Sequence, residues 1–314
     1  MKQIRNYSLL AGAVLTFALT SCNNNEIGTI PYEGPVAAQV SAGINGVTTR
    51  ATDAAWANGD AIGISCSSDG NVTKYDNMKY VTASGNGTFT HYTGDSEDLA
   101  NGIFFQGTGQ VAFSAYYPFT GTEKTPAGTI ENVTTEDQTK QKSFDYLYAT
   151  GATAAYNSPA VSFNGTGTKF KHKMTRLILI IKTLASDGFE AGDVASGAYS
   201  ISGIKHSGKF DTATGTAEAT GSATDDWAIT ATATDQSNER TYSMILYPQG
   251  STPSLTFKAT IKNQDYTATI TPALAASTSY TYTITVKKSG LTVSSCTIEG
   301  WGAEQTGNGE ATMK

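Results

Sequence analysis

Apolar and polar residues alternate along much of this chain, and the first clear stretch of alternation covers residues 36 to 44. On one side of an extended chain it places the apolar side chains of Val36, Ala38, Val40, Ala42 and Ile44. A period of two is typical of a half-buried β-strand, because successive side chains of a strand point to opposite faces. The same pattern returns in residues 280 to 286.

Further short strands are predicted between turn residues such as glycine, proline, asparagine and serine. They cover residues 61 to 65, 111 to 117, 160 to 163, 177 to 181, 199 to 204, 242 to 247, 255 to 261 and 266 to 270. Long runs of helix-forming residues at helical spacing are missing. The pattern therefore predicts an all-β protein of antiparallel β-sandwiches. Because the run from Leu177 to Ile181 is continuously apolar, it is expected to be buried on both faces.

The N-terminus has the pattern of an export signal. Lys2 and Arg5 precede an apolar run from about Leu9 to Leu19, which is too short to span a bilayer, so residues 1 to 21 are predicted to be a signal peptide. Small residues directly before Cys22 resemble a bacterial lipoprotein signal, which implies lipidation (palmitate) of Cys22 by the lipoprotein maturation machinery. An ordinary cleaved signal followed by an incidental cysteine is the alternative.

The length of the exported chain predicts two domains. About 290 residues remain after the signal, more than one small sandwich needs. Turn residues gather between residues 152 and 168, which favours a boundary there. The predicted division is a tether with a removable first strand in residues 22 to 50, an N-terminal sandwich in residues 51 to 158 and a C-terminal sandwich in residues 159 to 314.

Charge and candidate chemistry exclude several classes of protein. Without Lys2 and Arg5 the 21 basic residues become 19 against 27 acidic ones, a balance of −8 that does not favour nucleic acid as a partner. The three histidines have no metal-site spacing, and no catalytic motif is present. We therefore expect no catalytic residue, no metal and no cofactor, which leaves an enzyme as the least supported class. His172 is expected to be a packed or capping residue.

Two cysteines, Cys66 and Cys296, remain after Cys22 is assigned to lipid. An exported protein can form a disulfide. Each cysteine nevertheless lies in a predicted strand, where a buried free thiol behaves as a small apolar side chain. Pairing therefore stays open.

Several stretches together resemble the fimbrillin family, the subunits of type V pili in Gram-negative anaerobes. The resemblance starts with a W-x-x-G-D-x-I-G-I arrangement at Trp56, which by itself predicts a core anchor followed by a turn and a strand. The other stretches are FSAYYP at residues 113 to 118, DYLYA at 145 to 149, FKHKM at 170 to 174 and IEGW at 298 to 301. They occur in the family's order across nearly the whole chain.

The resemblance implies two transthyretin-like β-sandwich domains in tandem and a function in adhesion. It also implies that an arginine-specific protease removes the N-terminal segment and that a strand of the next pilus subunit replaces it by β-strand addition. In this sequence the cut would fall between Arg50 and Ala51, the strand lost would be residues 36 to 44, and the chain would be released from Cys22. The expected location is the outer membrane and then the fimbrium at the cell surface, with a receptor on a host or another bacterium as a further partner.

Three points stay open. The tail after Trp301 lacks apolar alternation, so a donor strand would have to come from residues 291 to 301, and tip or accessory subunit is as well supported as stalk. An anchor subunit, which would keep its first strand and its lipid, is the third position. The competing function is a permanently lipid-anchored protein that binds glycans through exposed rings among its 16 tyrosines. The triplet Asp211-Thr212-Ala213 resembles a short O-glycosylation site, which would place a glycan on Thr212.

Overall fold

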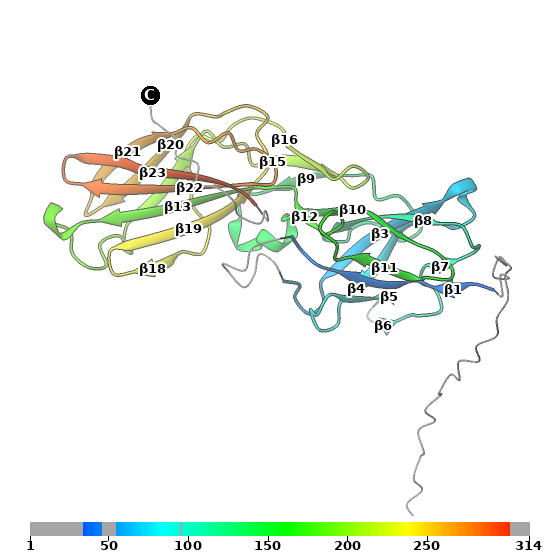
Figure 1. The fold of residues 1–314 in the computed structure, drawn as a ribbon. Helices are drawn as coiled ribbons and strands as arrows, with labels where there is room; N and C mark the ends of the chain where they lie inside the picture. The colour runs from blue at the N-terminus through cyan, green and yellow to red at the C-terminus, as the bar shows by residue number, and fades with distance from the viewer. Residues whose placement is uncertain (1–33, 46–54, 95, 302–314) are drawn as a thin grey trace, which may run out of the picture. The chain divides into compact units, whose positions relative to one another are not determined.

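The computed structural model of the chain consists of β-strands joined by turns and a few short 3-10 helices (Figure 1). It describes residues 34–45, 55–94 and 96–301, and these belong to one compact unit. The 3-10 helices are η1 (Asp69–Asn71), η2 (Gln138–Ser143) and η3 (Ala185–Asp187). The predicted all-β class is confirmed. Within the described ranges, no helix has the length and apolar content needed to cross a bilayer.

The first half of the described chain forms one long sheet that folds over its own core. In spatial order its strands are β11 (Ala160–Phe163), β2 (Gln39–Ala42), β5 (Thr88–Thr93), β4 (Lys74–Val81), β3 (Ala61–Ser68), β8 (Val111–Tyr117), β10 (Leu147–Ala154) and β12 (Lys171–His172). Alongside them β6 (Ser96–Glu97) pairs with β5, and β1 (Val36–Ala37) pairs with β7 (Phe104–Phe105). Because β10 and β11 lie against each other, the sheet encloses side chains such as Ile62, Phe89 and Phe163.

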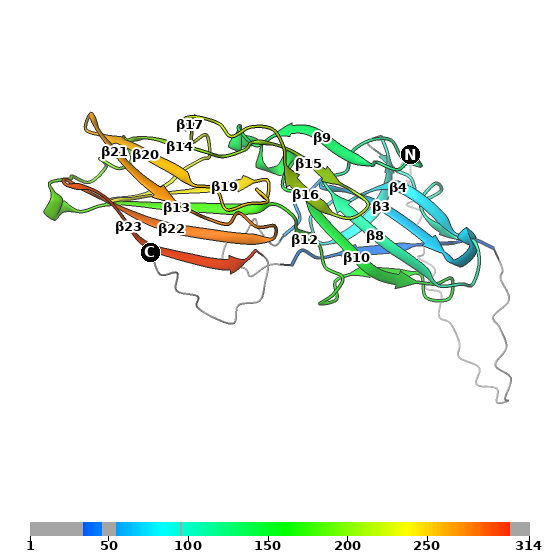
Figure 2. The same ribbon diagram turned by 90° about the horizontal axis from the view of Figure 1, so that it is seen from above.

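The second half forms two facing sheets with a separate core between them (Figure 2). One sheet has the order β18 (Thr234–Gln236), β19 (Glu239–Leu246), β13 (Thr175–Thr183), β22 (Thr278–Lys287) and β23 (Gly290–Gly300). The other has the order β17 (Trp227–Ala228), β14 (Ala198–Ser202), β20 (Leu255–Ile261) and β21 (Gln264–Ile270). Leu179, Phe257 and Ile284 are fully buried between them.

A further, smaller sheet links residues of the two halves. It has the order β16 (Thr216–Ala219), β15 (Ser207–Asp211) and β9 (Thr129–Thr134), so β9 from the first half pairs with β15 from the second. Below it the ring of Tyr146 stacks on Phe210 with 4.5 Å between ring centroids. Gly208 must lack a side chain here, because a Cβ would lie 2.4 Å from the ring of Tyr247. The two halves are therefore packed together through a shared aromatic cluster.

Two predictions about strand pairing need correction. Residues 36 to 44 do not form one continuous strand, because the chain changes partners at Ala38, from β7 to β5 and β11. The sheets are also not wholly antiparallel, since β2 pairs with β11 and β13 pairs with β22 in parallel. Parallel neighbours arise because each pair joins strands far apart in the sequence, which a hairpin does not connect.

The prediction that residues 177 to 181 are buried on both faces is wrong. Leu177, Leu179 and Ile181 are fully buried, whereas Ile178 and Ile180 are only half-buried. The strand β13 is central in its sheet, but only one face of that sheet covers the core. The predicted division between residues 158 and 159 stays a prediction, although β11, which was expected to follow it, belongs to the sheet of the first half.

Candidate functional site: the groove of the first strand

The segment from Val36 to Ile44, here called the first strand, has the inward face that its alternation predicts. Val40 is 4% exposed and Ala42 is 2% exposed, whereas the intervening residues are more accessible. Ala38 and Ile44 pack on the same core from positions near the strand ends. Figure 1 shows this segment in blue beside β11. The first strand is therefore an integral part of the sheet and its core.

The first strand lies between two neighbours that do not otherwise pair with each other. On one side Val40 and Ser41 pair antiparallel with Phe89 and Thr88 of β5. On the other, the whole of β2 pairs in parallel with β11, and β2 is the sheet partner of β11 within the described ranges. Because β2 separates β5 from β11, its departure would leave unpaired backbone groups on both sides of an open groove.

Backbone hydrogen bonds hold the first strand at both ends. Near its start, Ala38 donates its N–H to the carbonyl of Ile103 over 2.9 Å. At its end, Gly43 donates to Phe163 over 3.0 Å, and Phe170 donates to Gly43 over 3.0 Å. The partners of the first strand therefore extend beyond β5 and β11 to the segments around residues 103 and 170.

Trp56, the first residue of the W-x-x-G-D arrangement, binds the first strand from the core side. Its indole N–H donates to the carbonyl of Ala42 over 2.7 Å, and its ring meets the edges of Phe89 and Phe170 at 5.1 Å between centroids. Gly87 approaches the same carbonyl so closely that a Cβ would lie 2.7 Å from it, at a backbone φ of 85°. The predicted core anchor is thus confirmed, but its contact with the first strand was not predicted.

Asp60 of the same motif fixes the turn that carries Trp56. Its carboxylate accepts the backbone N–H of Ala57 over 2.6 Å and the hydroxyl of Tyr117 over 3.2 Å. Asp60 and burial together keep the pKa of Tyr117 well above its ordinary value, with burial as the larger cause. The motif therefore builds a rigid support for the end of the first strand.

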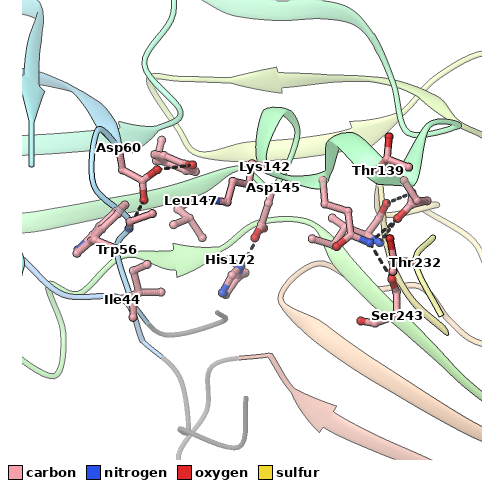
Figure 3. Close-up of a pocket in the computed structure, with 16 residues that line it drawn as sticks. Ile44, Trp56, Asp60, Thr139, Lys142, Asp145, Leu147, His172, Thr232 and Ser243 are labelled. Carbon is pink, nitrogen blue, oxygen red and sulfur yellow. Dashed lines mark hydrogen bonds and ion pairs between the residues drawn. The ribbon is translucent and has the colours of Figure 1, made fainter. Parts of the chain in front are cut away.

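A cavity of about 520 Å³ lies beyond that end (Figure 3). Ile44, Trp56 and Leu147 line it from the first half, and Ser243 and Ile245 line it from the second. In its wall the imidazole Nδ1 of His172 lies 2.8 Å from the carboxylate of Asp145. His172 also stacks on Trp301 with 3.9 Å between centroids, so its predicted role as a packed residue is confirmed.

A second cavity, of about 360 Å³, lies beside the start of the first strand. Ala38 and Val40 line it from the first strand, and Phe89, Leu99 and Ile103 contribute further apolar lining. Tyr80 also borders it, with its hydroxyl accepting the N–H of Ile103 over 2.9 Å. Burial raises the pKa of Tyr80 to about 12, so this hydroxyl stays neutral at physiological pH.

His91 holds the wall of this second cavity in place. Its Nδ1 lies 2.8 Å from the carbonyl oxygen of Asp98, and its Nε2 lies 2.9 Å from the carboxylate of Glu123. A neutral imidazole has one N–H, whereas a carbonyl and a carboxylate can only accept. Both hydrogen bonds therefore form together only when the His91–Glu123 pair carries one proton more than a neutral imidazole and an ionised carboxylate together. Apart from the presence of a histidine, no pattern in the sequence indicated this arrangement.

The other predicted site residues are distributed as follows. Cys22, Arg50 and Ala51 lie outside the described residues. The hydroxyl of Thr212 is buried and donates to the carbonyl of Gly128 over 2.7 Å, so a glycan there would have to be attached before this turn folds. O-glycosylation of Thr212 stays a prediction.

The two remaining cysteines are separate free thiols in the structure. Burial raises the pKa of Cys66 to about 12, which keeps it protonated and inert as a small apolar side chain. Cys296 packs from β23 against the core of the second half. Among the described residues no group of three or more histidine, cysteine or acidic side chains is placed to hold a metal ion.

Comparison with known proteins agrees with this architecture. A family model described as fimbrillin-like matches residues 49–301. A protein named as a fimbrium subunit, Fim1C, from Bacteroides uniformis is 30% identical over 98% of this chain and 100% of its own length. A crystal structure of a protein described in terms of cell adhesion, from Bacteroides ovatus, is 24% identical, with a TM-score of 0.68 over 87% of this chain and 100% of that one. Another, from Bacteroides uniformis, is 26% identical, with a TM-score of 0.65 and the same coverage.

Proposed function

This chain belongs to the fimbrillin-like family, whose members are structural adhesion proteins rather than enzymes, and we propose that it joins a cell-surface fimbrium by exchange of its first strand. The observation that carries the proposal is the position of β2 between β5 and β11. An inserted strand, unlike an edge strand, leaves a template on both sides when it departs. An extended segment of a neighbouring subunit would then restore the ladder hydrogen bonds and fill the groove.

Removal of the first strand requires a cut in the chain behind it. We place this cut between Arg50 and Ala51, made by an arginine-specific protease. The support is the position of Arg50 after the strand and before Trp56, and the start of the family match at residue 49. Cleavage would also separate the mature chain from lipidated Cys22, so the lipid would serve as an anchor during transport to the outer membrane.

Exchange needs a donor as well as an acceptor, and this chain is better suited as an acceptor. Its last described strand, β23, pairs with β22 along its length and packs Leu291 and Val293 against the core of the second half. Donating β23 would therefore uncover part of its own core. This favours a position at the tip or as an accessory subunit over one in the stalk.

Glycan binding by a permanently anchored protein has less support. Such a site usually needs aromatic rings that solvent can reach, because sugars stack on their faces. Among the described residues, the tyrosines and tryptophans are all buried or half-buried. The tyrosine content is explained by packing in the cores and in the aromatic cluster between the halves.

The proposal is tested at the N-terminus of the mature protein. Mass spectrometry would identify the first residue of the chain in a sheared surface fraction and in the membrane fraction of the same cells. We expect Ala51 in the sheared fraction and acylated Cys22 in the membrane precursor. A sheared fibre whose subunits still contain residues 36 to 44 would contradict strand exchange.

A substitution tests the protease at the same junction. Arg50→Lys keeps the positive charge but removes the arginine, so an arginine-specific protease should no longer cut there. We expect the variant to remain in the membrane fraction and to be absent from fibres. The matched control is Lys173→Arg, which keeps the charge at a half-buried position away from the junction and should leave assembly unchanged.

A further inference from the structure

We propose that the groove fits an incoming strand with a large aliphatic side chain, such as leucine, isoleucine or methionine, at the position that Ala38 now occupies. This inference rests on the proposed function for the identity of the occupant, a strand of a neighbouring subunit. The fit of the groove to a larger side chain rests on the structure of the described residues alone. A larger side chain at this position would make the incoming strand bind the groove more tightly than the resident first strand does.

The chain changes its ladder partner at Ala38, and this change creates the space for a larger side chain. Two residues further on, Val40 pairs with Phe89 of β5, but Val36 and Ala37 have already turned to pair with β7. The two strands β1 and β5 therefore separate at the level of Ala38 and His91. The cavity of about 360 Å³ lies in this gap, with Ala38 in its wall.

The cavity wall defines the chemistry of the side chain it accepts. Phe89, Ile103 and Leu99 contribute apolar surface, and Leu99 is 64% exposed, which is high for a large apolar residue. Two polar groups of the wall already have partners, since the Tyr80 hydroxyl binds the N–H of Ile103 and the His91 ring lies against Asp98 and Glu123. A polar side chain would find no free partner among these groups, whereas an aliphatic one would cover exposed apolar surface.

The equivalent position near the other end of the strand shows what a filled site looks like. Ala42 is 2% exposed and lines neither of the two cavities. Its carbonyl is held by the indole of Trp56 and approached by the backbone of Gly87. A larger side chain there would have to displace core residues. Ala42 is therefore the matched control for Ala38.

The first experiment tests the fit in the intact chain and is independent of strand exchange. Ala38→Leu should raise the thermal midpoint by about 4 °C, and Ala38→Val should raise it by less, because each buried methylene adds to the stability of the filled groove. Ala42→Leu should lower the midpoint. If Ala38→Leu lowers the midpoint as Ala42→Leu does, there is no room at Ala38 and the inference is overturned.

The second experiment tests capture of an incoming strand. The folded chain is cut after Arg50 with an arginine-specific protease, since Arg176 and Arg240 are half-buried in β13 and β19. Synthetic peptides of residues 34 to 45, with alanine or leucine at position 38, then compete with the resident segment, and native mass spectrometry measures displacement. The leucine peptide should bind about 50-fold more tightly, the factor expected for three additional buried carbon atoms.

The outcomes separate the inference from the proposed function. Displacement by both peptides with equal affinity overturns the inference and leaves strand exchange intact. If neither peptide displaces the segment although Ala38→Leu stabilises the chain, the fit of the groove is supported and the release step of the proposed function is contradicted. Preferential displacement by the leucine peptide supports both.

Discussion

The first strand and the last described strand of this protein are held in different ways. The first strand has a neighbour on each side, β5 and β11, and its central inward residues are buried. The last, β23, lies at the edge of its sheet with β22 as its ladder partner, and its residues are exposed or half-buried. Losing an edge strand leaves one unpaired edge, whereas losing an inserted strand leaves a groove with two. The comparison teaches that the acceptor site of the proposed strand exchange would belong to the first half of the chain.

A tryptophan contacts the C-terminal end of each strand, and the two tryptophans differ in how their indole rings are held. The indole N–H of Trp56 donates to Ala42, whereas the buried indole N–H of Trp301 makes no hydrogen bond with the residues that the structure describes. Trp301 is held instead by stacking on His172 and by the guanidinium of Arg176, 5.3 Å from its ring centroid. Trp56 therefore binds the strand itself, while Trp301 packs the point where its strand ends.

The largest effect expected is from Trp56→Ala. Removing the ring opens a cavity beneath the first strand and leaves the Ala42 carbonyl without its donor, so the free energy of unfolding should fall by about 4 kcal/mol. Urea denaturation of the intact chain measures it, with the exposed Val72→Ala as the control. A loss below about 1 kcal/mol would show that Trp56 does not anchor the strand.

Lowering the pH should have the next largest effect on the free energy of unfolding. The variants of the two strands should therefore be compared at one fixed pH. Burial lowers the pKa of His206 from 6.5 to about 4 in the folded chain. Between these values the unfolded chain binds more protons, so stability falls as the pH drops from about 6.5 through 4, by at most about 3 kcal/mol. His206→Gln should flatten this part of the curve of unfolding free energy against pH. An unchanged slope would contradict the assignment to His206.

Phenylalanine substitutions sharpen the comparison of the two tryptophans. Trp56→Phe keeps an aromatic ring but loses the hydrogen bond to Ala42, which should cost about 2 kcal/mol of unfolding free energy. Trp301→Phe removes a buried N–H that has no partner in the described part of the chain, so its cost should stay below about 1 kcal/mol. Equal losses in urea denaturation would mean that ring volume, not the hydrogen bond, determines both effects.

The smallest effects test burial along the strands themselves. Val40→Thr places a hydroxyl in the core beside Phe89 and should cost about 1.5 kcal/mol. Ile298→Thr lies on β23 at a position that is 46% exposed, so it should change stability by less than about 0.5 kcal/mol. The thermal midpoints of the two variants provide the measurement. A larger loss at Ile298 would show that β23 is held more firmly than its exposure indicates.

Predictions from the sequence were most successful where the evidence is local. Alternation identified the inward face of the first strand and most strands of the second half, because successive side chains of any strand point to opposite faces. The motif at Trp56 predicted a core anchor and indicated the family, which the comparisons support. Neither source predicted that Trp56 reaches Ala42, because the turn that directs its ring depends on Asp60 and Tyr117, which lie 57 residues apart.

By itself, then, the sequence determined the all-β class, the family and the strand whose inward residues fill the groove. Tertiary structure alone decided that the first strand divides at Ala38, that β11 belongs to the first sheet, and that His91 faces two acceptors. The physical reason is the range of the interactions involved. Side-chain direction in a strand follows from neighbouring residues, whereas the choice of ladder partner depends on the hydrogen bonds and contacts of residues far away in the chain.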